Sequence, residues 1–124
     1  MIRTAHWFGI QEIFCSLDCA DAFSPKVVQA TMGSIFAVEI IYTNLEKFLP
    51  KQNVPVYGAL LEGENIYQNS KKEKGILLIG NEGKGISKEL LPIISHPITI
   101  PALGDAESLN AGVAAGILMG QLVQ

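Results

Sequence analysis

Residues 75–85 read GILLIGNEGKG, and this stretch decides the fold class. After the opening glycine, residues 76–79 are apolar at four successive positions, so a strand there would be buried on both faces. A strand of this kind belongs in a sheet that is covered on both sides, as parallel strands are. Gly80 and Asn81 then end the apolar run and open a loop.

Strand-like and helix-like segments alternate along the rest of the chain. We expect strands at residues 11–16, 38–42, 54–61, 75–79 and 97–100. We expect helices at residues 3–8, 24–33, 44–50, 87–94 and 109–124. The alternation predicts an α/β fold with a mostly parallel sheet and helices on both faces.

Length and composition indicate one ordinary globular domain over residues 1–124. The chain is 48% hydrophobic and 17% charged, which excludes intrinsic disorder. Nine basic residues against twelve acidic ones give a net charge of −3, so the chain is not a self-sufficient nucleic-acid binder. Lysines gather at residues 71–74 and 84–88, as a solvated surface or as an RNA contact.

The cysteines and the apolar C-terminal stretch exclude several protein classes. Cys15 and Cys19 fit no disulfide scaffold and no zinc pattern, so we expect two reduced thiols, no metal and a cytoplasmic protein. Residues 109–123 are uncharged but shorter than the roughly 20 residues of a bilayer span, which excludes a membrane helix. Gly112, Gly116 and Gly120 would form a ridge on this helix where another backbone packs closely.

Three loops that follow expected strands carry the candidate chemistry, because ligands bind at the carboxyl ends of strands in open α/β sheets. They are residues 59–64 (ALLEGE), 80–85 (GNEGKG) and 101–110 (PALGDAESLN). The second loop matches neither the dinucleotide fingerprint nor the P-loop, so it is either a plain turn or a site built around Glu82. Ser108 is a natural helix cap, with Asn110 in the first turn facing the helix mouth. His6 and His96 lie far from any nucleophile motif, which excludes a Ser-His-Asp triad.

Taken in order, three segments resemble the SpoU (TrmH-like) family of RNA 2′-O-ribose methyltransferases, in the SPOUT superfamily. They read IRTAHWFG, LLIGNEGKGIS and IPALGDAESLNAGVAAG, and SPKVVQATMGSIF matches the segment between the first two. The resemblance implies a C-terminal trefoil knot, S-adenosyl-L-methionine as cofactor, a tRNA or rRNA substrate and a homodimer.

The resemblance also implies the site residues. The family's catalytic positions correspond to Arg3, Glu82, Ser108 and Asn110. Its cofactor-binding positions correspond to Leu60, Glu62, Gly63, Gly80, Asn81, Gly83, Ile100, Leu103, Ser108, Leu109 and Asn110. Since the pKa of an arginine exceeds about 12, we expect Arg3 to grip the target phosphate rather than to act as a base.

Two departures from the family pattern leave alternatives open. The family has a strand and an asparagine ahead of the arginine, and the last motif here reads SLNAG instead of SLNVS. We therefore expect an N-terminally truncated member, either an active methyltransferase or a cofactor-binding and dimerisation module without catalysis. An unrelated nucleotide-binding α/β protein is the third reading.

Overall fold

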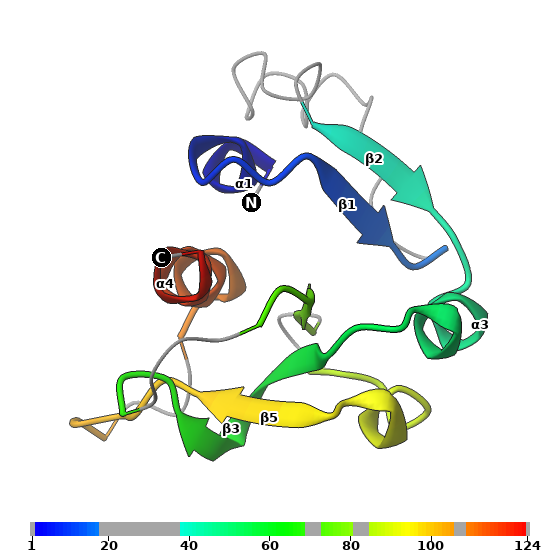
Figure 1. Ribbon diagram of the computed structural model, residues 1–124. Coiled ribbons are helices and arrows are strands. Elements are labelled where there is room, and N and C mark those ends of the chain that lie inside the picture. The colour runs from blue at the N-terminus through cyan, green and yellow to red at the C-terminus, as the bar shows by residue number, and fades with distance from the viewer. Residues whose placement is uncertain (1, 18–37, 69–72, 81–84, 106–108, 124) are drawn as a thin grey trace. The chain divides into compact units, whose positions relative to one another are not determined.

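The computed structural model describes residues 2–17, 38–68, 73–80, 85–105 and 109–123 (Figure 1). The chain divides into two compact units, Met1–Phe48 and Leu49–Gln124, each with its own parallel sheet. The α/β class with parallel strands is confirmed, although the strands form two sheets rather than one. A single domain, helices on both sheet faces and the knot stay predictions. The helix expected at residues 24–33 lies outside the described residues.

The described residues of the first unit form a two-stranded sheet and two short helices. Its elements are α1 (Ile2–Trp7), β1 (Glu12–Cys15), β2 (Glu39–Tyr42) and α3 (Leu45–Phe48). β1 and β2 pair in parallel, with Ile13 opposite Ile40 and Phe14 opposite Ile41. The ring of Phe14 stacks on that of Phe48, with the centroids 4.3 Å apart, and so ties β1 to α3.

α1 ends where the sequence predicts, at a glycine. Gly9 has a φ of +77°, which is a left-handed conformation that glycine adopts without steric strain because it has no Cβ. The Gly9 amide donates to the His6 carbonyl at 3.1 Å, and the Ile10 amide donates to the Ala5 carbonyl at 2.9 Å. These bonds satisfy carbonyls of the last turn, and the chain then turns into β1.

The second unit is a three-stranded parallel sheet packed against the C-terminal helix. Its elements are η2 (Leu49–Lys51), β3 (Val56–Asn65), β4 (Ile76–Leu78), η3 (Leu91–Ile93), β5 (His96–Thr99) and α4 (Ala111–Leu122). The strand order is β4-β3-β5, so β3 is central. Figure 1 shows α4 on one side of β3 and β5.

The core of the second unit joins that helix to the sheet. Tyr57, Ile66, Ile98 and Leu118 are all at least 96% buried and form one cluster. The Tyr57 hydroxyl donates a hydrogen bond to the Glu73 carbonyl at 2.7 Å, so this buried aromatic also has its polar atom satisfied. Ile98 has no exposed surface at all and lies at the centre of β5.

The helix expected at residues 87–94 is wrong. These residues form turns and the short η3, with hydrogen bonds between residues three apart: Leu90 N to Ser87 O at 3.0 Å and Ile93 N to Leu90 O at 3.0 Å. Pro92 is the physical reason, because it has no amide hydrogen and cannot continue an α-helical ladder. Pro50 likewise lies inside η2 instead of closing a helix.

The strand expected at residues 54–61 is longer than predicted. β3 runs from Val56 to Asn65, so the expected loop at residues 59–64 belongs to the strand. The register against β5 shifts within it, since Ala59 and Glu64 both pair with Ile98. The extra residues therefore leave the regular ladder as a bulge, which we define as residues 60–63.

Ile98→Ala should lower the free energy of unfolding by about 2–5 kcal/mol, because it leaves a cavity in the centre of the sheet. Ile98→Val should cost about 0.5–1.5 kcal/mol. Leu61→Ala is the control, because Leu61 is 78% exposed and should change stability by at most about 0.5 kcal/mol. Urea denaturation followed by circular dichroism measures all three. Equal losses for Ile98→Ala and Leu61→Ala would contradict the assigned core.

Candidate functional site

The bulge in β3 forms the first part of the candidate site. The Thr99 hydroxyl donates to the Leu61 carbonyl at 3.1 Å, and the Ile66 amide donates to the Thr99 carbonyl at 3.0 Å. Thr99 is thus bonded both to Leu61 within the bulge and to Ile66 just after β3. No feature of the sequence marked Thr99, because a threonine at the end of a strand is ordinary.

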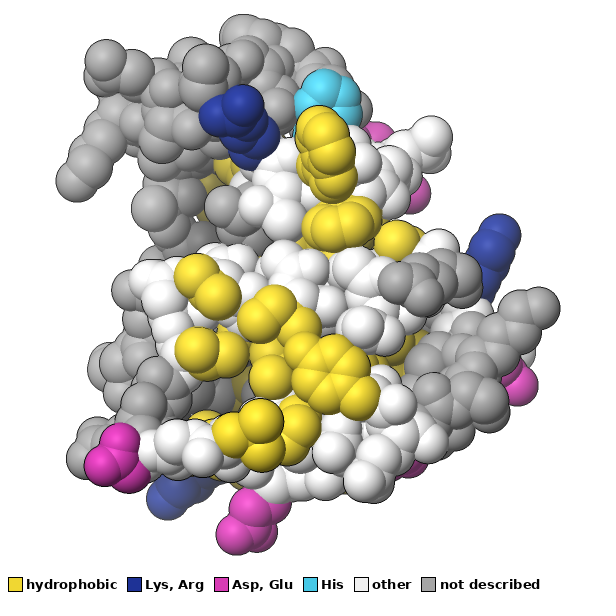
Figure 2. Space-filling view, turned by 90° about the vertical axis from the view of Figure 1, so that its left-hand side faces the viewer, with side chains coloured by type: hydrophobic (Ala, Val, Ile, Leu, Met, Phe, Trp, Pro, Cys, Tyr) yellow, Lys and Arg dark blue, Asp and Glu magenta, His cyan; other side chains and the backbone are white. Residues whose placement is uncertain are grey.

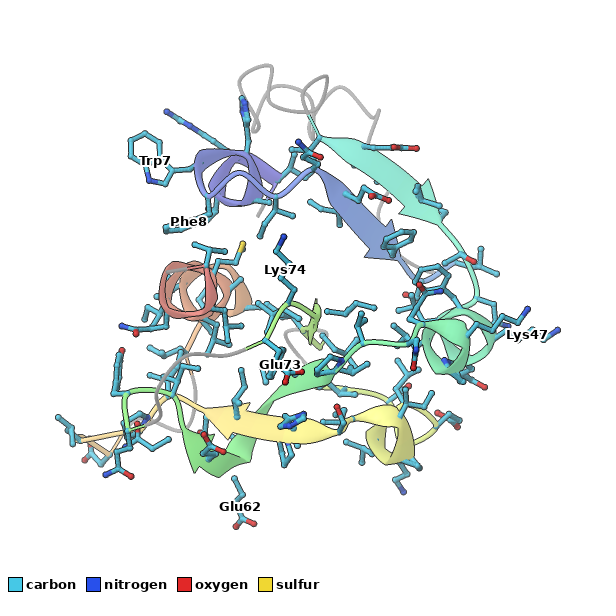
Figure 3. The ribbon with its side chains drawn as sticks, viewed as in Figure 1. Trp7, Phe8, Lys47, Glu62, Glu73 and Lys74 are labelled. Carbon is cyan, nitrogen blue, oxygen red and sulfur yellow. The ribbon has the colours of Figure 1, made fainter. Side chains whose placement is uncertain are left out.

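The predicted residues of the bulge lie at the edge where β3 and β5 end. Leu60 is half-buried, whereas Glu62 and Gly63 are exposed. A Cβ on Gly63 would lie 2.8–2.9 Å from backbone atoms of Pro97 and Ile98, so only a glycine fits this close approach. Figure 3 shows Glu62 projecting from β3 on the side away from α4.

The loop after β4 begins at Gly80 and closes on itself. A Cβ on Gly80 would overlap the backbone of Gly85 and Ile86, so the two ends of this loop are in contact. Gly85 has a φ of +70°, the left-handed conformation that favours glycine. The expected site residues between these ends, namely Asn81, Glu82 and Gly83, lie outside the described residues.

The segment after β5 presents apolar side chains at the same edge. Ile100 is half-buried, Leu103 is 99% exposed and Leu109 is 50% exposed. Exposed leucines provide an apolar surface of the kind on which a flat heterocycle packs. Ser108 lies outside the described residues.

The prediction that Asn110 lies within the first turn of the last helix is wrong. Asn110 is itself the N-cap of α4, and its Oδ1 accepts hydrogen bonds from Gly112 N at 2.8 Å and Val113 N at 3.3 Å. The α4 residues Ala115, Leu118 and Met119 are buried. A fixed Oδ1 also fixes the amide group, whose NH₂ end is left as the donor toward a ligand.

Two of the three segments at this edge carry acidic but no basic side chains in their described parts, whereas the exposed Lys88 follows the remaining segment, the loop after β4. Glu62, Glu64 and Asp105 are all exposed there, and residues 59–65, 100–105 and 109–110 contain no Lys or Arg. We call these three carboxylates the acidic rim. The rim favours a cationic or neutral ligand and opposes direct contact with a phosphate backbone.

Arg3 belongs to the first unit. It lies on α1 and is exposed, and its helix is held by the bonds at Gly9 described above. Arg3 and the three segments at the β3–β5 edge belong to different units and are separate parts of the candidate site.

The described residues contain no cluster of three or more His, Cys, Asp or Glu side chains suited to holding a metal ion. Within the same part of the chain, we find no helix with the length and apolar character needed to cross a membrane.

Comparison with known proteins gives relatives over nearly the whole chain. A 23S rRNA guanosine 2′-O-methyltransferase of Bacillus subtilis is 37% identical over 123 residues, which are 96% of this chain and 50% of the relative. The solved structure of an AdoMet-bound rRNA methyltransferase from Sinorhizobium meliloti is 37% identical, with a TM-score of 0.88 over 97% of this chain and 48% of its own. That of the SpoU methyltransferase AviRb from Streptomyces viridochromogenes, in complex with AdoMet, is 25% identical, with a TM-score of 0.85.

The chain spans about half the length of these relatives. The alignment with AviRb, for example, includes 98% of this chain and 52% of the AviRb chain. The sequence profile of the SpoU rRNA Methylase family matches residues 1–120. A match over this span includes α1, both sheets and most of α4. The chain therefore belongs to the SpoU rRNA methylase family.

Proposed function

We propose that this chain is the catalytic domain of an S-adenosyl-L-methionine-dependent methyltransferase that acts on a ribose 2′-hydroxyl of tRNA or rRNA. The observation that carries the proposal is the edge of the second sheet, which is formed by the bulge within β3, by Gly80 after β4 and by the segment from Ile100 to Asn110 after β5. Family membership and the AdoMet-bound relatives support the same ligand.

The residues at this edge fit the chemistry of that cofactor. Leu103 and Leu109 offer apolar surface to an adenine ring, and closely packed glycines leave backbone groups within reach of a ribose. The acidic rim suits a ligand with a positively charged sulfonium and ammonium group. These features support a cofactor site made of Leu60, Glu62, Gly63, Gly80, Asn81, Gly83, Ile100, Leu103, Ser108, Leu109 and Asn110.

When bound, the cofactor supplies an electrophilic methyl group. The target 2′-oxygen forms the new bond to carbon as the carbon–sulfur bond breaks, and the hydroxyl proton must leave to a base or to solvent. The NH₂ end of Asn110, whose Oδ1 is held by the α4 cap, is suited to orienting an oxygen atom. Arg3 grips the phosphate beside the target ribose through its planar fork. Glu82 and Ser108 complete the proposed catalytic set.

A homodimer built partly on α4 belongs to this proposal, together with the trefoil knot and a cytoplasmic location. Val113 on this helix is 53% exposed, Leu109 ahead of its N-terminal end is 50% exposed, and Val123 at its C-terminal end is 50% exposed. Figure 2 shows hydrophobic side chains gathered over the part of the second unit that includes α4. Such a patch is typical of a surface that a second copy covers.

A second candidate function is a cofactor-binding and dimerisation module without catalysis. The acidic rim and the net charge of −3 favour it, because both oppose an RNA backbone. Methyl transfer to bulk tRNA or rRNA by the purified chain separates the two candidates.

The chain should bind S-adenosylhomocysteine, and Gly80→Ala should weaken that binding. The new Cβ would push apart the ends of the loop after β4, at a cost to stability of about 1–3 kcal/mol. Gly75→Ala is the matched control, since a Cβ on Gly75 would meet the Pro55 carbonyl with comparable strain at the other end of β4, outside the proposed cofactor site. Calorimetric titration of the three proteins gives the affinities. Equal affinity for both variants would argue against a site at Gly80.

Arg3→Ala should leave the S-adenosylhomocysteine affinity unchanged and lower methyl transfer by about 10- to 100-fold, the usual loss for a hydrogen bond to a charged group. Lys47→Ala is the control, because Lys47 is an exposed cation of the same unit that projects outward from α3 (Figure 3). Transfer of labelled methyl groups to RNA measures the effect. Full activity of Arg3→Ala would remove Arg3 from the proposed mechanism.

Val113→Glu should dissociate the proposed dimer and raise its dissociation constant at least about tenfold, because it would bury an unpaired charge. Val54→Glu makes the same substitution at a residue outside α4 that is 44% exposed, and it should leave the dimer intact. Light scattering at micromolar concentration gives the mass. A monomeric parent chain, or equal dissociation by both variants, would contradict an interface on α4.

A further inference from the structure

The bulge of β3, residues 60–63, lacks the support that holds a regular strand. Within the described strands, the register gives none of these residues a partner in β4 or in β5. The Leu61 side chain is 78% exposed, and that of Glu62 is exposed and projects away from α4 (Figure 3). Unless other contacts hold it, such a segment becomes ordered only when a ligand binds, and this ordering costs affinity.

Two contacts from β5 supply the missing support. The Thr99 hydroxyl donates to the Leu61 carbonyl at 3.1 Å, and we call this contact the Thr99 bond. The backbone of Gly63 lies so close to Pro97 and Ile98 that a Cβ would come within 2.8–2.9 Å of their backbone atoms. The second contact depends on the absence of a side chain, whereas the first depends on a single hydroxyl group.

The Thr99 bond also fixes the direction of one hydrogen-bond donor. The described peptide bonds include no cis bond, and in a planar trans peptide the N–H points opposite to the C=O. The Glu62 amide shares its peptide plane with the Leu61 carbonyl, so its N–H points away from Thr99. A donor of fixed direction outside the strand ladder is suited to an oxygen or nitrogen atom of a ligand.

We propose that Thr99 is a positioning residue for the cofactor, because its hydroxyl holds the bulge in the conformation that S-adenosyl-L-methionine binds. The inference rests on the proposed function, in which Leu60, Glu62 and Gly63 contact the cofactor. In this role Thr99 acts through the backbone of the bulge rather than on the reacting atoms. Since these contacts stay the same during methyl transfer, loss of the Thr99 bond should raise the KM for the cofactor and leave kcat unchanged.

Ser95 provides a matched control at the other end of β5. Its hydroxyl oxygen accepts from the Val56 amide at 2.8 Å, and the hydroxyl donates to the Val56 carbonyl at 3.3 Å. Ser95 and Thr99 therefore both bind the backbone of β3 through a hydroxyl group. Val56 is the first residue of β3, however, and lies outside the bulge. A purely structural role would apply to both hydroxyls, whereas a role in cofactor binding applies to Thr99 alone.

Calorimetric titration with S-adenosylhomocysteine measures the affinity of each variant. Thr99→Val should weaken binding by about 2- to 10-fold, which corresponds to the loss of one neutral hydrogen bond. Thr99→Ala also lacks the hydroxyl and should show a loss of the same size. Thr99→Ser keeps the hydroxyl and should retain the affinity of the parent chain. Ser95→Ala should unfold at a lower urea concentration and still bind with the parent affinity.

Steady-state kinetics give a second readout. Thr99→Val should raise the KM for S-adenosyl-L-methionine by the same factor as the dissociation constant, with kcat and the KM for RNA unchanged. Parent affinity in Thr99→Val and Thr99→Ala would overturn the inference. An equal loss of affinity in Ser95→Ala would also overturn it, because affinity would then follow stability. Circular dichroism checks that each variant is folded.

Failure of the inference and failure of the proposed function give different results. If the chain transfers methyl groups and Thr99→Val has the KM of the parent, the function stands and the positioning role falls. If Thr99→Val weakens S-adenosylhomocysteine binding but the parent transfers no methyl group, the positioning role stands and the proposed catalysis falls. A parent chain that does not bind S-adenosylhomocysteine would overturn both.

Discussion

Parallel pairing of β3 with β5 around the fully buried Ile98 is the constraint on which the second unit depends. Ile98 faces Leu118 of α4 and Tyr57 of β3 within one cluster, so the sheet and the helix cannot separate without opening the core. The same pairing sets where β3 must bulge, since two of its residues compete for the position opposite Ile98. The candidate cofactor edge is therefore a direct product of core packing.

Close backbone approaches determine the shape of this edge more than side chains do. Gly63 lies against the backbone of Pro97 and Ile98, and Gly80 lies against that of Gly85. Where backbone meets backbone, peptide groups remain near the surface and can serve as donors and acceptors of fixed direction. A site of this kind recognises a ligand through shape and hydrogen bonds, with little need for charge.

The two units differ in their exposed side chains, and each suits a different ligand of the proposed reaction. The second unit has exposed leucines and the acidic rim, which suit a small cationic ligand and repel phosphates. The first unit offers Arg3 on α1, which suits a phosphate. This separation reconciles a net charge of −3 with the proposed RNA substrate, because contact with RNA needs local basic groups rather than a basic chain.

The sequence by itself determined the α/β class, the glycine that ends α1 and the apolar strand β4, because each depends on a local pattern of periodicity or turn chemistry. Tertiary structure decided the rest. Ser108 and Asn110 are equally good caps in isolation, and the buried face of α4 is set by packing against the sheet, with Asn110 at its cap. The bulge of β3 and its bond from Thr99 likewise arise only when β5 lies alongside, because a register shift is a property of two strands.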